Sequence, residues 1–174
     1  FVQENRTRQE WLRRFFYEGN CLCHPSLLIR RECYEQLGTY DERFFQLPDL
    51  DFWIRLCLRW QIHILPEKLV RFRVRYNEAN VSGSRLENLI RNDNEMLFVL
   101  QAFESLEGEN DFFNVFPTFA YLRRSEGFVL SYVLALVCLD KRLGRVYHCF
   151  GLQLLYKLMG KARQRRKLKD VYGF

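Results

Sequence analysis

The chain has 174 residues, of which 48% are apolar and 16% aromatic. This is enough apolar surface to build a hydrophobic core, so a wholly disordered chain is excluded, and the mean hydropathy of −0.28 excludes a bundle of membrane-spanning helices. The formal net charge is +6, but residues 157–170 contain seven bases and one acid, so the rest of the chain is neutral and the basic character belongs to the C-terminal segment.

The first half of the sequence predicts helices alternating with short strands. Apolar residues at helical spacing, bounded by turn signals, predict three helices, over residues 4–19, 30–37 and 48–60. Short apolar runs predict three strands, over residues 21–29, 61–65 and 69–75. Pro25 interrupts the first strand. Pro48 begins the third helix, because a proline suits the first turn, where its missing N–H is not needed.

The second half is predicted to be almost entirely helical. A polar connection over residues 76–83 precedes it, and the expected helices cover residues 85–105, 111–124, 127–139 and 145–167. Pro117 should break the second of these helices. The apolar stretch 128–139 is shorter than the ~20 residues that a membrane-spanning helix needs, so we expect a buried core helix there.

The six cysteines form no C-x-x-C pair, and most lie inside apolar runs. We therefore expect reduced thiols of a cytosolic protein rather than a disulfide framework. The segment Cys21-Leu22-Cys23-His24 has the composition of a metal-ligand cluster, but a zinc site would need a second, distant pair of ligands. The sequence contains no such pair, and it predicts no metal site.

Four landmarks follow one another between residues 20 and 82. They are His-Pro-Ser-Leu-Leu-Ile-Arg-Arg at 24–31, Leu-Gly-Thr-Tyr-Asp-Glu at 37–42, Pro-Asp-Leu-Asp-Phe-Trp-Ile-Arg-Leu at 48–56 and Leu-Val-Arg-Phe-Arg at 69–73. In this order and spacing they resemble the second half of a family 2 glycosyltransferase of the GT-A fold. The resemblance implies that residues 1–82 form the C-terminal, acceptor-side portion of such a domain. Residues 83–174 would then be a helical extension with a basic tail.

The fold class implied is α+β and predominantly helical, with a small sheet remnant of a GT-A domain followed by a C-terminal helical region. No counterpart of the family's nucleotide-binding strands and Asp-x-Asp metal motif precedes residue 20, so we expect this chain to lack the donor half and to be inactive alone. No cofactor is expected within it, whereas a divalent ion, Mg²⁺ or Mn²⁺, is expected in the full-length enzyme. The implied reaction is inverting transfer of a sugar from a nucleotide-sugar to a hydroxyl acceptor, in the synthesis of a surface polysaccharide or glycolipid.

Asp49 carries the predicted chemistry. Sugar transfer to a hydroxyl needs a base that takes the hydroxyl proton, and the free N–H groups and dipole of a helix start favour a charged carboxylate. By the resemblance, Asp49 is this catalytic base. Asp51 lies about 200° further around the helix, so the two carboxylates cannot share one task. We expect Asp51 to support the helix start or the substrate site. The alternative is that both are ordinary acids of a first helical turn.

Five further residues are candidates for substrate binding. The resemblance places His24 near the acceptor, although a histidine before proline is more often a structural hydrogen-bonding residue. Phe44 and Phe45, in the loop before the base, are candidates for lining an acceptor groove. Arg73 and Arg75 either face the donor's pyrophosphate or form the solvated side of an edge strand. Relatives often have a metal-ligating histidine where this chain has Arg75, so no metal ligand is expected there.

The C-terminal segment 145–169 combines an apolar stripe with a basic end, a pattern typical of a helix lying on an anionic membrane. The alternative is a core helix with a solvated basic end. The first interpretation implies a cytoplasmic protein that is peripheral on the inner face of the membrane. The sequence is also compatible with a homo-oligomer. The rival function is a non-enzymatic helical interaction module whose tail binds a partner, a membrane or RNA. No nucleic-acid motif with interleaved aromatics is present, so we expect no nucleic-acid partner.

Overall fold

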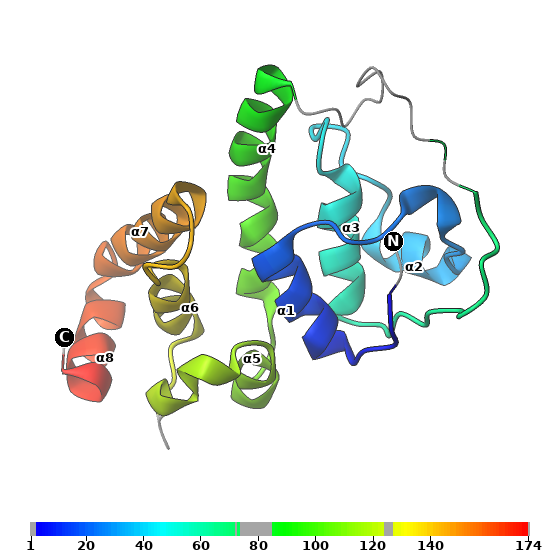
Figure 1. The fold of residues 1–174 in the computed structure, drawn as a ribbon. Coiled ribbons are helices and arrows are strands. Elements are labelled where there is room, and N and C mark those ends of the chain that lie inside the picture. Colours follow the sequence, from blue (N-terminus) through cyan, green and yellow to red (C-terminus); the bar gives the residue numbers. More distant parts are fainter. Residues whose placement is uncertain (1–2, 72, 74–84, 124–126, 174) are drawn as a thin grey trace. The chain divides into compact units, whose positions relative to one another are not determined.

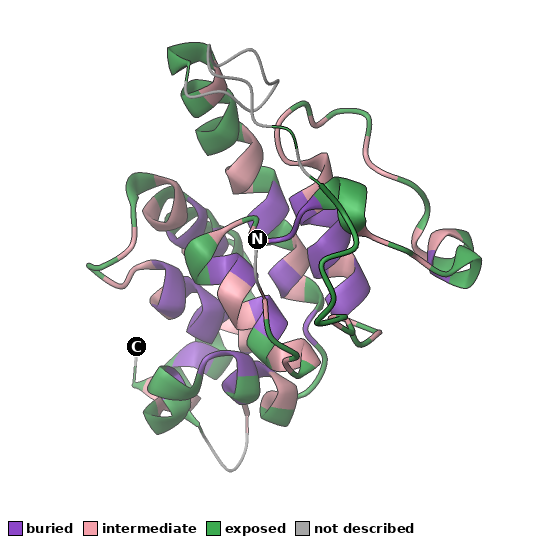
Figure 2. Ribbon diagram, turned by 45° about the vertical axis from the view of Figure 1, so that its right-hand side comes forward, coloured by how far each residue is buried: buried purple, intermediate pink, exposed green. Residues whose placement is uncertain are grey.

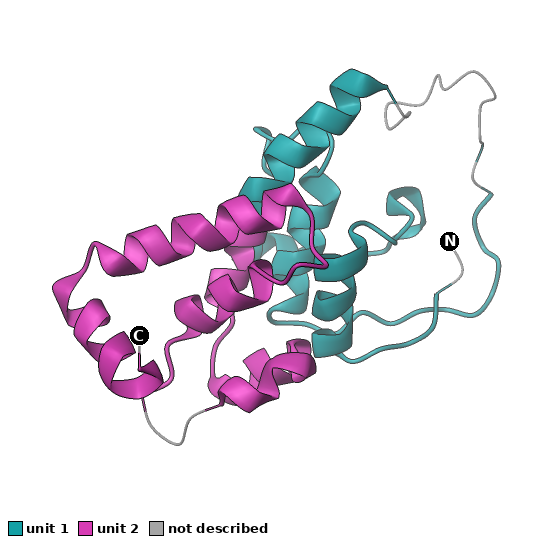
Figure 3. Ribbon diagram, turned by 60° about the vertical axis from the view of Figure 1, so that its left-hand side comes forward, with its two compact units in different colours: residues 1–99 teal, residues 100–174 magenta. Residues whose placement is uncertain are grey.

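The computed structural model describes residues 3–71, 73, 85–123 and 127–173, and it divides into two compact units, residues 1–99 and 100–174 (Figure 1, Figure 3). The first unit contains α1 (Arg8–Glu18), the 3₁₀ turn η1 (His24–Ser26), α2 (Arg31–Leu37), α3 (Pro48–Cys57) and α4 (Leu86–Val99). The second contains η2 (Leu100–Ser105), α5 (Glu109–Val115), η3 (Pro117–Leu122), α6 (Leu130–Cys138), α7 (Arg145–Met159) and α8 (Ala162–Tyr172). The predominantly helical class is confirmed. No sheet occurs in the described ranges, so the predicted sheet remnant is not found there.

The core of the first unit lies between α1 and α3. Thr7 and Glu10 form a capping box at the start of α1, in which each side chain accepts the backbone N–H of the other residue. The apolar stripe predicted for this helix is buried, and its members are Trp11, Leu12, Phe15 and Phe16. The buried apolar residues of α3 are Leu50, Phe52, Trp53, Ile54, Leu56 and Cys57. Figure 2 shows that helices such as α1 bury one side and expose the other.

Two of the predicted strands are wrong. Residues 21–29 contain η1, whose first turn accommodates Pro25, and residues 61–65 run without a strand partner in the described chain. The Asn5 side chain takes the place of a neighbouring strand: its amide donates to the Ile64 carbonyl at 3.0 Å and its oxygen accepts the Ile64 N–H at 2.7 Å. A single extended segment cannot form a ladder, which needs a second backbone.

The third predicted strand, over residues 69–75, is described only in part. Residues 69–71 and 73 are not in a strand, and residues 72, 74 and 75 lie outside the described residues. The strand is therefore absent from the described residues of this segment.

The predicted helix over residues 145–167 is two helices. α7 ends at Met159 and α8 begins at Ala162, with Gly160 and Lys161 between them. Lys161 has an extended backbone (φ −104°, ψ 111°), and glycine is a poor helix former, so the chain changes direction at this point. The helix expected over residues 85–105 likewise changes from α to 3₁₀ geometry after Val99.

The second unit is built around the contact of α6 with α7. α6 is buried on most of its surface, as predicted from its apolar sequence. Gly151 permits this contact, because a Cβ atom there would lie 2.9 Å from the Ala135 carbonyl oxygen. No helix in the described ranges is both long and apolar enough to cross a membrane. The expected domain boundary between residues 82 and 83 stays a prediction. The division between the two compact units falls between Val99 and Leu100 in the chain.

Candidate functional site

The loop that leads into α3 is fixed by a carboxylate from a distant helix. α3 begins at Pro48, and Leu47 before it makes no side-chain cap. Glu95 of α4 supplies the acceptor instead, since its carboxylate accepts the three backbone N–H groups of residues 45–47, each at 2.8 Å. These charge-assisted hydrogen bonds hold the entry to α3 and thus the turn that carries Asp49.

Asp49 is half-buried in this first turn, and both of its carboxylate oxygens accept hydrogen bonds. Oδ1 accepts the backbone N–H of Leu50 at 2.8 Å, and Oδ2 accepts the side-chain amide of Asn20 at 2.5 Å. The oxygen of the Asn20 amide accepts the N–H of Leu22 at 3.3 Å, which leaves the NH₂ group directed at Asp49. Asn20 therefore orients the carboxylate that the sequence predicts as the base.

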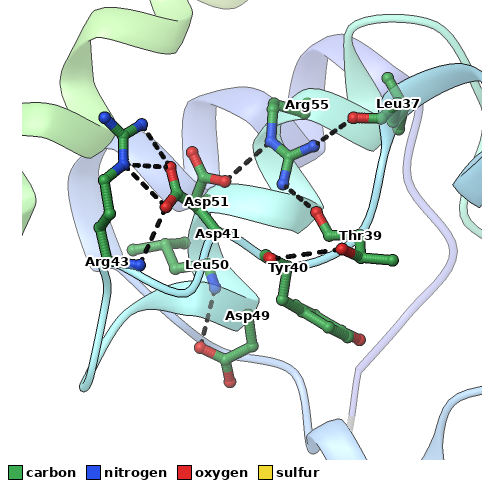
Figure 4. Close-up of polar contacts among 9 residues, drawn as sticks. All are labelled: Leu37, Thr39, Tyr40, Asp41, Arg43, Asp49, Leu50, Asp51 and Arg55. Atoms are coloured by element: carbon green, nitrogen blue, oxygen red, sulfur yellow. Dashed lines mark hydrogen bonds and ion pairs between the residues drawn. The ribbon is translucent and has the colours of Figure 1, made fainter.

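Asp51 points to the other side of α3 (Figure 4). It is 8% exposed, and its Oδ2 accepts a hydrogen bond from Arg55 Nε at 2.7 Å. The Nη groups of Arg55 donate to the carbonyl oxygens of Leu37 at 2.8 Å and Thr39 at 3.0 Å, so the pair ties α3 to the end of α2. Burial raises the pKa of Asp51, and the hydrogen bond and charge of Arg55 oppose that rise. In this position Asp51 anchors Arg55, which links α3 to the end of α2. Its predicted role in substrate binding stays a prediction.

The loop after α2 has an ion pair of its own. The backbone N–H and the guanidinium of Arg43 both donate to the carboxylate of Asp41, with the shortest contact at 2.6 Å (Figure 4). These hydrogen bonds lower the pKa of Asp41 to about 2. Because Asp41 stays charged, the turn keeps its shape over the whole neutral range of pH.

His24 lies in a cluster of rings beside α3. It is exposed, and its Nε2 lies 3.0 Å from the hydroxyl of Tyr40. Its ring also contacts the buried ring of Trp53, with centroids 5.8 Å apart. Burial raises the pKa of Tyr40, a hydrogen bond with Tyr34 adds to the rise, and the charge of Asp49 contributes as well. Tyr40 thus stays protonated, and it connects His24 with the surroundings of Asp49.

The remaining predicted substrate residues are two phenylalanines of the loop before α3 and two arginines. Phe45 is 58% exposed, with the Arg91 guanidinium 4.8 Å from its ring centre, and Phe44 is half-buried. Arg73 is exposed, and Arg75 lies outside the described residues. Their predicted roles stay predictions.

The structure identifies three residues that the sequence did not: Asn20, Tyr40 and Glu95. Asn20 acts on a residue 29 positions away, and Glu95 acts on a loop about 50 positions away. No local pattern marks such contacts. Tyr40 lies within a recognised landmark, and its aromatic neighbours could have drawn attention to it.

No three His, Cys, Asp or Glu side chains in the described ranges are arranged to hold a metal ion. All six cysteines are free thiols, and four of them are buried: Cys23, Cys33, Cys57 and Cys138. Burial raises the pKa of Cys138 to about 12, so this thiol stays protonated at neutral pH.

Comparison with known proteins supports a relationship at a coarse level. A segment of 79 residues, 45% of this chain, is 25% identical to a protein of Methanocaldococcus jannaschii described as an uncharacterized glycosyltransferase. The match spans 27% of that protein's length. No family model and no solved structure matches the chain. Part of the chain is thus related to a glycosyltransferase, and the finer assignment to family 2 and the GT-A fold stays a prediction.

Proposed function

We propose that this chain is the acceptor-side part of an inverting glycosyltransferase of family 2 and GT-A type, with Asp49 as the catalytic base. The observation that supports the proposal is the position, partial burial and hydrogen bonding of this carboxylate. It lies in the first turn of α3, half-buried, and the Asn20 amide orients it at 2.5 Å. A carboxylate held in this way stays partly open to an incoming group while its direction is defined, which general-base catalysis requires.

The proposed reaction is the one that the resemblance implies. Asp49 takes the proton of an acceptor hydroxyl as the hydroxyl oxygen attacks the anomeric carbon of a nucleotide-sugar. The new C–O bond forms on the face opposite the leaving group, and the bond from carbon to the nucleoside diphosphate breaks, with its electron pair leaving on the phosphate. In this proposal Asn20 keeps Oδ2 in place during the transfer. The exposed ring of His24, which is held by the Tyr40 hydroxyl, would contact the acceptor, as the resemblance implies.

The donor side belongs to a part of the enzyme beyond this chain. A Mg²⁺ or Mn²⁺ ion on the diphosphate is expected there. The described residues offer no group of three His, Cys, Asp or Glu ligands for such an ion. Because the resemblance covers only the acceptor side, we expect the chain alone to turn over no donor.

The test uses the full-length protein that contains this chain. Release of nucleoside diphosphate is measured with UDP-glucose, UDP-galactose, UDP-N-acetylglucosamine and GDP-mannose, with and without a lipid or sugar acceptor. Asp49→Asn should lower kcat about 10²–10⁴-fold with little change in KM for the donor, because the amide cannot accept the proton.

Asp93→Asn is the matched control, since Asp93 is an exposed acid of α4. It should leave kcat unchanged. Comparable kcat values for Asp49→Asn and the control would refute the role of Asp49, and no turnover of any of these donors by the parent would count against sugar transfer.

A further inference from the structure

The second unit exposes two apolar side chains on the outer side of α7. Leu152 is 58% exposed and Tyr156 is 85% exposed, and the two lie one helical turn apart. The opposite side of α7 is occupied, because Gly151 meets α6 and the residues Phe150, Leu154 and Leu158 are buried. At about 100° per residue, Leu152 and Tyr156 lie across the helix from these contacts. They therefore face away from α6.

The helix that follows is strongly basic. The exposed bases between residues 161 and 170 are Lys161, Arg163, Arg165, Arg166, Lys167 and Lys169, and Asp170 is the one acid among these ten residues. Leu168 is buried, and the ring of Tyr172 packs on Tyr132 with centroids 4.7 Å apart. α8 uses this apolar side for packing. At about 100° per residue, Arg163 and Arg166 lie across the helix from Leu168, and all six cations are exposed.

We propose that the outer side of α7, at Leu152 and Tyr156, and the basic side of α8 together form a docking surface for an anionic phospholipid bilayer. The cations attract phosphate headgroups, and a leucine with an adjacent tyrosine suits the boundary between headgroups and acyl chains. A single-stranded nucleic acid would stack on several aromatic side chains. Tyr156 is the one exposed aromatic residue of α7 and α8, both of which are fully described. The proposal does not depend on sugar transfer.

The test is co-sedimentation of the 174-residue chain with vesicles of phosphatidylcholine alone and of phosphatidylcholine with phosphatidylglycerol. Binding is expected to the anionic vesicles and to weaken as salt is added, because the cations are exposed. The triple variant Arg163→Gln, Arg165→Gln, Arg166→Gln should lower the partition coefficient roughly 100-fold. The double variant Leu152→Ser, Tyr156→Ser should lower it roughly tenfold, since less apolar surface is buried.

The matched control removes three exposed charges outside α7 and α8, with Arg59→Gln, Lys68→Gln and Lys141→Gln. This variant should bind within about twofold of the parent if position rather than net charge decides. Equal loss in the control and the α8 variant would overturn the proposal. So would an unchanged Leu152→Ser, Tyr156→Ser variant, or binding of a single-stranded oligonucleotide in preference to anionic vesicles. Circular dichroism of each variant confirms the fold, and the salt titration tests the parent without any substitution.

Discussion

Arg55→Ala should destabilise the first unit far more than a similar change on the surface. Arg55 donates to three acceptors: Asp51 Oδ2 at 2.7 Å and the carbonyl oxygens of Leu37 and Thr39 at 2.8 and 3.0 Å. The substitution leaves the Asp51 carboxylate buried without its counter-charge. It also leaves the carbonyl oxygens of Leu37 and Thr39 without the guanidinium that donates to them.

The expected loss is about 3 kcal/mol of the free energy of unfolding. Removing one partner of a buried ion pair costs about 3–5 kcal/mol, and the lower end applies because the Arg55 side chain is 23% exposed and water can replace part of it. Arg31 provides a matched control. It forms an ion pair with Glu35 at the same four-residue spacing and at 2.8 Å, but its side chain is 91% exposed. Arg31→Ala should cost no more than about 0.5 kcal/mol.

The loss should also depend on pH. Burial raises the pKa of Asp51 and Arg55 opposes the rise, so removing Arg55 raises this pKa further. Folded Asp51 then binds a proton at a higher pH than unfolded Asp51 does. The stability of Arg55→Ala is therefore highest below the unfolded pKa and is lost as pH rises through the folded one, with a slope of at most about 1.4 kcal/mol per pH unit.

The assay is urea denaturation followed by tryptophan emission. All three tryptophans, Trp11, Trp53 and Trp60, belong to the first unit, so the signal reports on that unit. If Arg55→Ala costs no more than Arg31→Ala, or if its deficit is the same at about pH 4 and pH 7, the ion pair does not hold α3 to α2 as we infer.

Two further substitutions test how the helices are held. Glu95→Ala should lower the free energy of unfolding of the first unit by about 2 kcal/mol, because the N–H groups of residues 45–47 lose their acceptor. Glu95→Gln should cost less, because one side-chain oxygen remains to accept. A negligible loss of stability for both variants in urea denaturation would contradict this prediction. Gly151→Ala should cost about 1–3 kcal/mol, because the new methyl group meets the Ala135 carbonyl at 2.9 Å, and it should be visible as a lower melting temperature by circular dichroism. Gly144→Ala is its control, since a Cβ there has no atom within 4 Å, and a similar fall in both variants would disprove the close contact.

The candidate site was predicted where its signal is local. α3 begins at Pro48 with Asp49 in its first turn, as the sequence predicted, and the structure shows that Asp49 is half-buried there. The role of Asp49 as a base stays a prediction. The orientation of its carboxylate could not be predicted, because the donor is Asn20 and the loop is held by Glu95, both of them far away along the chain. Hydrogen bonds between such distant residues exist only once the helices have packed.

The sequence by itself determined the approximate position of most α-helices, because the spacing of apolar residues, proline starts and glycine stops act within a few residues. The stripe buried by α1 and the glycine ends of α1 and α2 follow from such local rules. The tertiary structure decided which extended segments become strands and which polar groups become partners. Residues 61–65 have the composition of a strand, yet their backbone at Ile64 bonds to the Asn5 side chain, because a ladder requires a second strand that the described residues do not provide.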